Sequence, residues 1–175
     1  MSRASAVVFA LLVVPIVASA EVPVNMTYDS MLAAGHKLYV GGDAKGALAK
    51  YEAAKEAESG KPGAYYFIGA AKAKLGELDE AVGSLNTAAT ISGDKDVALH
   101  AKALFAVAVV LEQKGDWDAA YDAWNKYLGY AQAHTDVQTF TESAKSRIAV
   151  IEKHRELEAE GAAVRSRAEN KGEQK

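Results

Sequence analysis

The sequence predicts an all-α fold, and three observations lead to that prediction. A pattern of glycine, an acidic residue, alanine and a large residue four positions later occurs three times along the chain. Beyond the third copy, apolar residues follow the i, i+3 and i+4 spacing of an amphipathic helix. No segment has the pattern of a convincing strand. With 175 residues, half of them hydrophobic, the chain is long enough for one domain with a buried core.

The pattern of residues 1–20 is typical of a secretory signal peptide. Arg3 precedes an apolar stretch, and the segment closes with three small residues that end at Ala20, as signal peptidase requires. The stretch is short for a membrane span, and Pro15 interrupts it. We therefore expect cleavage near Ala20 and export to the periplasm or the extracellular space; an uncleaved anchor is the alternative. The chain has no cysteine, so no disulfide supports the fold.

The repeated pattern reads "GGDAKGALAKYEAA", "LGELDEAVGSLNTAA" and "KGDWDAAYDAWNKY". Its central alanines are Ala47, Ala81 and Ala120, which lie 34 and 39 positions apart. The large residues that follow are Tyr51, Leu85 and Trp124. A small side chain lets two antiparallel helices approach closely, and the large one fills the groove beside the contact on the same helical face. One such pair cannot bury its apolar face alone, so the pairs are expected to stack.

A 34-residue unit of this kind resembles the tetratricopeptide repeat, over residues 28–133. Upstream of each turn the repeat's large and small positions hold Met31, Ala34 and Gly35, then Tyr65, Ile68 and Gly69, then Leu104, Val107 and Ala108. The turns carry Gly42, Gly76 and Gly115, which can adopt the positive φ that ends a helix. Two departures are Tyr127, at a position that is normally small, and Lys72, at one that is normally apolar. The resemblance implies a right-handed α-α superhelix of three helix pairs, with repeats at about 28–61, 62–95 and 101–134.

The expected helices follow from these repeats and from the stripe beyond them. They span residues 28–40, 44–58, 62–75, 78–91, 97–114, 117–132 and 137–158, after a short lead at 21–27. The last helix carries an apolar stripe of Val137, Phe140, Ala144, Ile148 and Ile151, which is typical of a capping helix that covers the open end of a stack. The domain is therefore predicted to span 28–158. Residues 159–175 are polar and are expected to be disordered; a segment that folds on a partner is the alternative.

The sequence gives no pattern typical of catalysis or of cofactor or metal binding. The four histidines are scattered, at His36, His100, His134 and His154, and no cysteine accompanies them. No glycine-rich phosphate loop and no nucleophile elbow is present. Charges of both signs are mixed, with a net charge of −3, which argues against nucleic acid as a partner. We therefore expect a protein that is not an enzyme and has no cofactor or metal.

The concave groove is the expected functional surface. In tetratricopeptide proteins the first helix of each pair lines this face, which by the repeat register here carries Leu32, His36, Tyr39, Tyr66, Phe67, Ala70, Lys102, Phe105 and Val109. The family's carboxylate clamp, which grips C-terminal chaperone tails, needs basic and amide residues where this chain has Leu32, His36, Phe67, Lys102 and Ala106. Only Lys102 fits, so we expect no such clamp. Packing of the aromatic residues between neighbouring helices is the alternative to an open groove.

The resulting hypothesis is an exported interaction module or scaffold that binds an apolar segment of a protein partner in its groove. By analogy with the family, the partner is expected in an envelope complex, and any membrane association would occur only through it. The alternative is a carrier of a small apolar ligand or acyl chain in the same groove. Self-assembly through stacked repeats is a third hypothesis. Trp117 and Trp124 are interpreted as packing residues.

Overall fold

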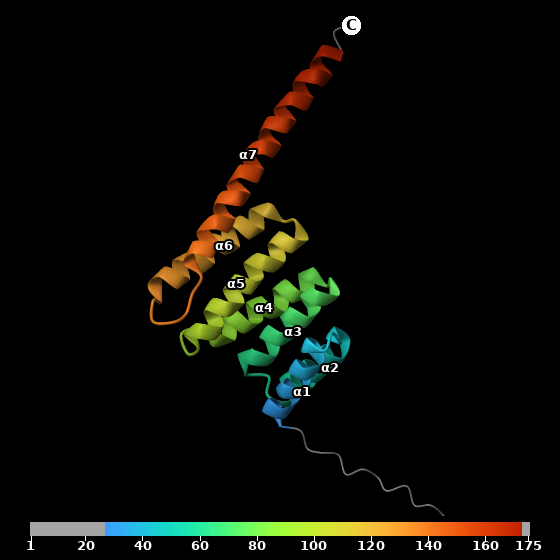
Figure 1. The fold of residues 1–175 in the computed structure, drawn as a ribbon, viewed down its shortest axis with the longest axis vertical. Coiled ribbons are helices and arrows are strands. Elements are labelled where there is room, and N and C mark those ends of the chain that lie inside the picture. The colour runs from blue at the N-terminus through green and yellow to red at the C-terminus, as the bar shows by residue number, and fades with distance from the viewer. Residues whose placement is uncertain (1–26, 173–175) are drawn as a thin grey trace, which may run out of the picture.

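The computed structural model describes residues 27–172 and has seven helices and no strand in that range. The helices are α1 (Tyr28–Val40), α2 (Ala44–Ala57), α3 (Pro62–Leu75), α4 (Leu78–Ser92), α5 (Val97–Lys114), α6 (Trp117–Ala133) and α7 (Thr141–Gly172). Figure 1 shows them stacked in chain order, with α7 extending away from the stack. The first six lie within one residue of their predicted bounds. The predicted signal peptide and most of the predicted lead lie outside the described residues.

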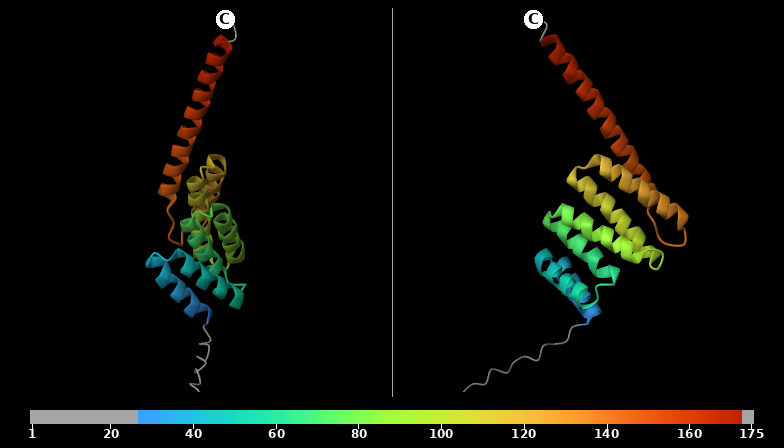
Figure 2. Two further views of the ribbon diagram at one scale, coloured as in Figure 1. Left: turned by 90° about the vertical axis from the view of Figure 1, so that its right-hand side faces the viewer. Right: turned by 180° about the vertical axis from the view of Figure 1, so that it is seen from behind.

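The helices form three antiparallel pairs that stack on one another. α1 packs on α2, α3 on α4 and α5 on α6, and each pair contacts the next through α2 and α3 or through α4 and α5. α3 also contacts α5, and α7 packs against α6 (Figure 2). No helix of the described part of the chain is long and apolar enough to cross a membrane.

Close contact within each pair depends on the small residues of the repeated pattern. The three central alanines are fully buried, and so are the large residues Tyr51, Leu85 and Trp124. The pairs approach so closely that a Cβ on Gly35 would lie 2.4 Å from Tyr51 Cε1, and one on Gly69 would lie 2.6 Å from Leu85 Cγ. Glycine therefore fits the first two pairs, whereas the third accommodates the buried Ala108.

The turns between the paired helices follow from two local signals. Gly76 and Gly115 end α3 and α5 with φ of 83° and 78°, a conformation that costs glycine little. Asp43 and Asp116 then begin α2 and α6, because each carboxylate accepts a hydrogen bond from a backbone N–H in the first turn.

The seventh helix begins later than predicted. It starts at Thr141 rather than at residue 137, so Val137 and Phe140 lie in the preceding loop and not on the helical stripe. The backbone N–H of Phe140 donates to Tyr127 Oη at 2.7 Å, which holds the end of this loop against α6. Tyr127 occupies the position where the repeat normally has a small residue, and its buried ring explains that departure.

The seventh helix also ends later than predicted. The structure continues α7 to Gly172, so residues 159–172, expected to be disordered, are helical. The segment contains no proline, and apart from Gly161 and Gly172 it is rich in alanine, glutamate and arginine, which favour helix. Once Ala144 and Ile151 are buried, each further residue adds a hydrogen bond to an existing helix without a new nucleation step.

Candidate functional site: the inner face

The surface carried by α1, α3 and α5, here called the inner face, contains three pockets in a row. The α1–α3 pocket has a volume of about 250 Å³, the α3–α5 pocket about 300 Å³ and the α5–α7 pocket about 440 Å³. Tyr66 lines both of the first two pockets, and Phe105 lines both of the last two. The three pockets therefore form a mostly apolar row along this face, here called the channel, in which each pocket shares a side chain with the next.

Aromatic rings build the α1–α3 pocket. The ring of Phe67 lies 4.3 Å from that of His36 and stacks at 5.3 Å on that of Tyr51. His36 Nδ1 and Tyr51 Oη are hydrogen-bonded at 3.0 Å. Burial raises the pKa of the Tyr51 phenol and of the Tyr66 phenol, and the nearby Tyr39 adds to both shifts. Both phenols are therefore uncharged at neutral pH and suit an apolar ligand with a few polar groups.

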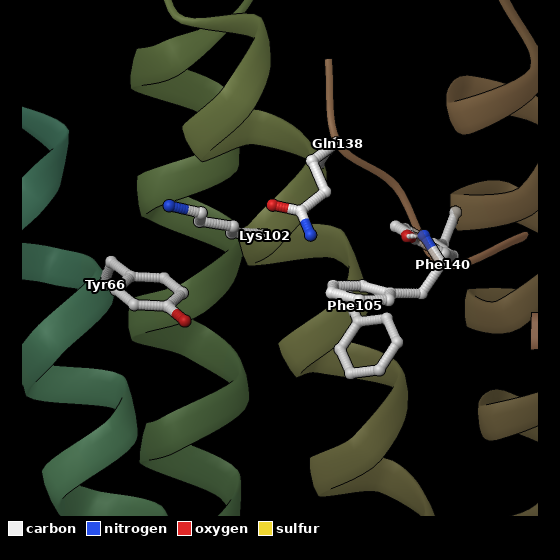
Figure 3. A pocket seen from close by; sticks show the side chains of 7 residues that line it. Tyr66, Lys102, Phe105, Gln138 and Phe140 are labelled. Atoms are coloured by element: carbon white, nitrogen blue, oxygen red, sulfur yellow. Dashed lines mark hydrogen bonds between the residues drawn. The ribbon is translucent and has the colours of Figure 1, made fainter. Parts of the chain in front are cut away.

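The α3–α5 pocket is open between two aromatic walls (Figure 3). Tyr66 on α3 forms one wall, and Phe140 from the loop before α7 forms the other. Phe105 lies on α5 between them, with its ring 5.8 Å from that of Phe140 and 4.9 Å from that of Trp124. Lys102 extends over the pocket toward Tyr66, as Figure 3 shows. It is the one charged side chain among the residues that line this pocket.

The α5–α7 pocket contains a buried carboxylate whose hydrogen bonds are satisfied. The side chain of Glu112 is only 7% exposed; it accepts a hydrogen bond from Arg147 Nε at 2.9 Å, and others from Arg147 Nη2 and Trp124 Nε1. These bonds connect α5, α6 and α7. Because the carboxylate is held between two donors, it serves as a structural link and not as a free acid or base.

The structure brings eight of the nine predicted groove residues into this channel. The first pocket is lined by His36, Tyr39, Phe67 and Ala70, and Tyr66 lines the first and the second. Lys102 lines the second pocket, Phe105 the second and third, and Val109 the third. Leu32 lines none of these three pockets, because it packs against the core clusters that contain Tyr28 and Tyr51. Several of the aromatic residues, including Tyr66 and Phe67, are half-buried, so they both pack between helices and face the channel.

Sequence reasoning missed Gln138, Phe140 and Arg147 as residues of this face. The sequence pattern places Phe140 on the apolar stripe of the capping helix, but in the structure this residue is 52% exposed and lines the α3–α5 pocket. The repeat register could not place it there, since it gives no position to a loop that follows the last repeat. Arg147 adds a second basic group beside the channel, but it is paired with Glu112. The described residues contain no cluster of three or more histidines and carboxylates that could hold a metal.

Trp124 is buried, in agreement with its interpretation as a packing residue. Trp117 is only half-buried and lies 4.6 Å from the ring of His154 on α7. It therefore packs at the edge of the domain, where it also lines the α5–α7 pocket.

No family model and no curated protein sequence matches the chain. Solved structures do match its fold. The tetratricopeptide domain of Sgt2 from Aspergillus fumigatus is 15% identical, with a TM-score of 0.63, and the match covers 79% of this chain and 87% of that one. The type III secretion chaperone SycD of Yersinia enterocolitica, solved with a peptide of the translocator YopD, is 16% identical, with a TM-score of 0.61, over 73% and 93% of the two chains.

The TPR2AB domain of yeast Sti1, solved as a complex with pHSP90, is 21% identical, with a TM-score of 0.65. That match covers 77% of this chain and 50% of the Sti1 chain. At these identities the likeness concerns the fold. It agrees with the repeated sequence pattern and with the three stacked pairs. The prediction of an all-α superhelix of three helix pairs with a C-terminal capping helix is therefore confirmed, and the chain has the tetratricopeptide-repeat fold.

Proposed function

We propose that the chain is an exported protein-interaction module that binds an apolar segment of a partner protein along the inner face. The observation that carries this proposal is the row of three mostly apolar pockets, in which neighbouring pockets share Tyr66 or Phe105. A channel that runs across α1, α3, α5 and α7 fits an elongated ligand, such as an extended peptide or one face of a helix, better than it fits a compact metabolite.

The chemistry of the channel favours apolar side chains in the partner. Exposed Val109 and Phe140 lie at the pockets together with the half-buried Tyr66 and Phe105. Apolar surface that stays open on a monomer commonly marks a site of interaction. The complexes of SycD with a YopD peptide and of Sti1 with pHSP90 show that this fold can hold peptide ligands, which supports a peptide as the ligand here.

Export and the cellular setting rest on the sequence of residues 1–20. A signal peptide would place the domain outside the cytoplasm, in the periplasm if the host is a Gram-negative bacterium. We propose that it helps an envelope complex to assemble there. Fractionation of cells that express the full chain with a C-terminal tag would test this. Recovery of a product shortened by about 20 residues in the periplasm or the medium is expected, whereas a full-length product in the cytoplasm would contradict export.

A second candidate function is transport of a small apolar ligand. The α3–α5 pocket favours it, because that pocket lies between two aromatic walls and has a volume of about 300 Å³, at the small end of the range for ligand sites. Native mass spectrometry of the purified protein distinguishes the two functions. A lipid or fatty acid that copurifies in stoichiometric amount would support the carrier.

Pull-down from envelope extract tests the interaction module. The bait is the chain from Glu21, and the test variant is Tyr66→Ala/Phe105→Ala, which removes the two rings that neighbouring pockets share. Tyr65→Ala is the matched control, because Tyr65 lies next to Tyr66 but lines a different pocket, between α2, α3 and α4. Circular dichroism must show that all three proteins remain helical. A partner that binds the wild type and the control but not the test variant supports the proposal; equal capture by all three contradicts it.

A further inference from the structure

The C-terminal half of α7 extends beyond the stacked pairs (Figures 1 and 2). Its last contacts with the stack are the ion pair of Arg155 with Asp118 and the 3.1 Å hydrogen bond from Tyr121 Oη to Glu152. From 156 to 167 every side chain is exposed, apart from the half-exposed Gly161, which has none. No part of the described chain covers this part of the helix.

One side of this part of the helix carries apolar or small residues at the spacing of a coiled coil. Leu157, Gly161 and Val164 follow one another at intervals of four and three residues, and Val150 lies seven residues before Leu157 on the same side. His154, at the position between Val150 and Leu157, instead packs against Trp117 of its own chain. Val150, Leu157 and Val164 are 57%, 56% and 62% exposed. The stripe is distinct from Ala144, Ile148 and Ile151, which pack against α6.

The charges beside this stripe are complementary to those of a second copy that runs in the opposite direction. Glu158 and Arg165 lie along one edge of the stripe, and Glu160 and Arg167 lie along the other. In an antiparallel pair, Glu158 of one helix faces Arg165 of the other, and Glu160 faces Arg167. The two-fold axis generates each pair twice, so four attractive pairs flank the contact.

The sizes of the stripe residues also favour the antiparallel direction. In an antiparallel pair, Gly161 of one helix lies opposite Val164 of the other. A small residue then faces a larger one at both positions, so the distance between the two helix axes stays constant. A parallel pair would place Gly161 against Gly161 and Leu157 against Leu157, which require different separations. We propose that two copies of the chain associate through residues 157–167 of α7 as an antiparallel coiled coil, with the repeat domains at opposite ends. The contact is short, so the dimer is expected to be reversible.

Sedimentation equilibrium of the chain from Glu21, which contains every described residue, tests this proposal over a concentration series. The first variant, Glu158→Arg/Glu160→Arg, makes the edges of the stripe basic, and the second, Arg165→Glu/Arg167→Glu, makes them acidic. Each variant alone should dimerise at least about tenfold more weakly than the wild type, because four attractive pairs become repulsive. An equimolar mixture of the two should recover the wild-type affinity, since attractive pairs form again between unlike chains.

Cysteine crosslinking tests the direction of the pair, since the natural chain has no cysteine. Mixed Gly161→Cys and Val164→Cys chains, carrying tags of different size, should form the mixed disulfide in preference to either homodimer. The proposal is overturned if the wild type stays monomeric, if either charge variant dimerises as well as the wild type, if the mixture fails to recover affinity, or if homodimeric disulfides predominate.

Discussion

The two halves of α7 have different surroundings although they belong to one continuous helix. In the first half, Ala144 and Ile151 are buried against α6, and Arg147 binds the buried Glu112. In the second half, Leu157 and Val164 are more than half exposed. The comparison shows that the helix is stabilised by packing in one half and by helix propensity and growth from that packed half in the other. The four predictions below test this difference at protein concentrations that keep the chain monomeric, unless stated otherwise.

The largest difference is expected for truncation of one aliphatic residue in each half. Ile151→Ala should lower the free energy of unfolding by about 2–4 kcal/mol, because Ile151 is 1% exposed and its loss leaves a cavity. Val164→Ala should change it by less than about 0.5 kcal/mol, because the side chain lies in solvent. Urea unfolding measures both values. Equal destabilisation would show that the second half is also packed in the monomer.

A smaller effect is expected for the ion pair that attaches the first half. Arg147→Met keeps most of the aliphatic stem but leaves the buried Glu112 with Trp124 as its remaining donor. We expect the free energy of unfolding to fall by about 1–3 kcal/mol, because the buried carboxylate then lacks its charged partner. Glu112→Gln/Arg147→Met should restore part of that loss, because the neutral amide is cheaper to bury. If the stability lost in the double variant equals the sum of the losses in Glu112→Gln alone and Arg147→Met alone, the two residues do not interact.

A still smaller effect on stability is expected when the second half is removed. Deletion of residues 157–175 should shift Tm by less than about 2 °C, because the described part of that segment buries almost nothing against the stack. The helical signal in circular dichroism should nevertheless fall, since part of α7 is lost. A fall in Tm comparable to that of Ile151→Ala would show that the second half of α7 also packs against the stack.

The smallest effect is expected in hydrogen exchange. At low concentration, the backbone amides after residue 158 should exchange faster than those between 144 and 155, because only local fraying is needed to open them. At high concentration the dimer should slow exchange in the second half. Leu157→Glu should remove that protection without changing exchange in the first half. Protection that does not depend on concentration would mean that the segment is held within its own chain.

The sequence was sufficient to predict the first six helices because their signals are local. Gly76 ends a helix with a backbone conformation that glycine adopts easily, and Asp43 and Asp116 begin helices through hydrogen bonds to residues three positions away. The small and large residues of each pair, such as Ala81 and Leu85, repeat at a period that reveals the stacking. The direction of Tyr66 and Phe105 toward the inner face followed from the same register.

The course of the chain after α6 could not be predicted, since it depends on contacts between residues far apart in the sequence. The segment before α7 resembled a helix because Val137 and Phe140 fit the apolar period. In the structure, Tyr127 binds the backbone of Phe140, and the ring of Phe140 lies beside Phe105. A period measures which side chains share a helical face, but it cannot show which distant group will compete for a backbone N–H.

The sequence was therefore enough to predict the number of helix pairs, their turns and the residues that point toward the inner face, because short-range sterics and side-chain periodicity control these features. Only the packing of the helices places Tyr66 and Phe105 between neighbouring pockets, makes Phe140 a wall of one pocket and buries Glu112 against Arg147. These features arise where separate helices meet, and their geometry depends on how whole elements pack rather than on any single stretch of sequence.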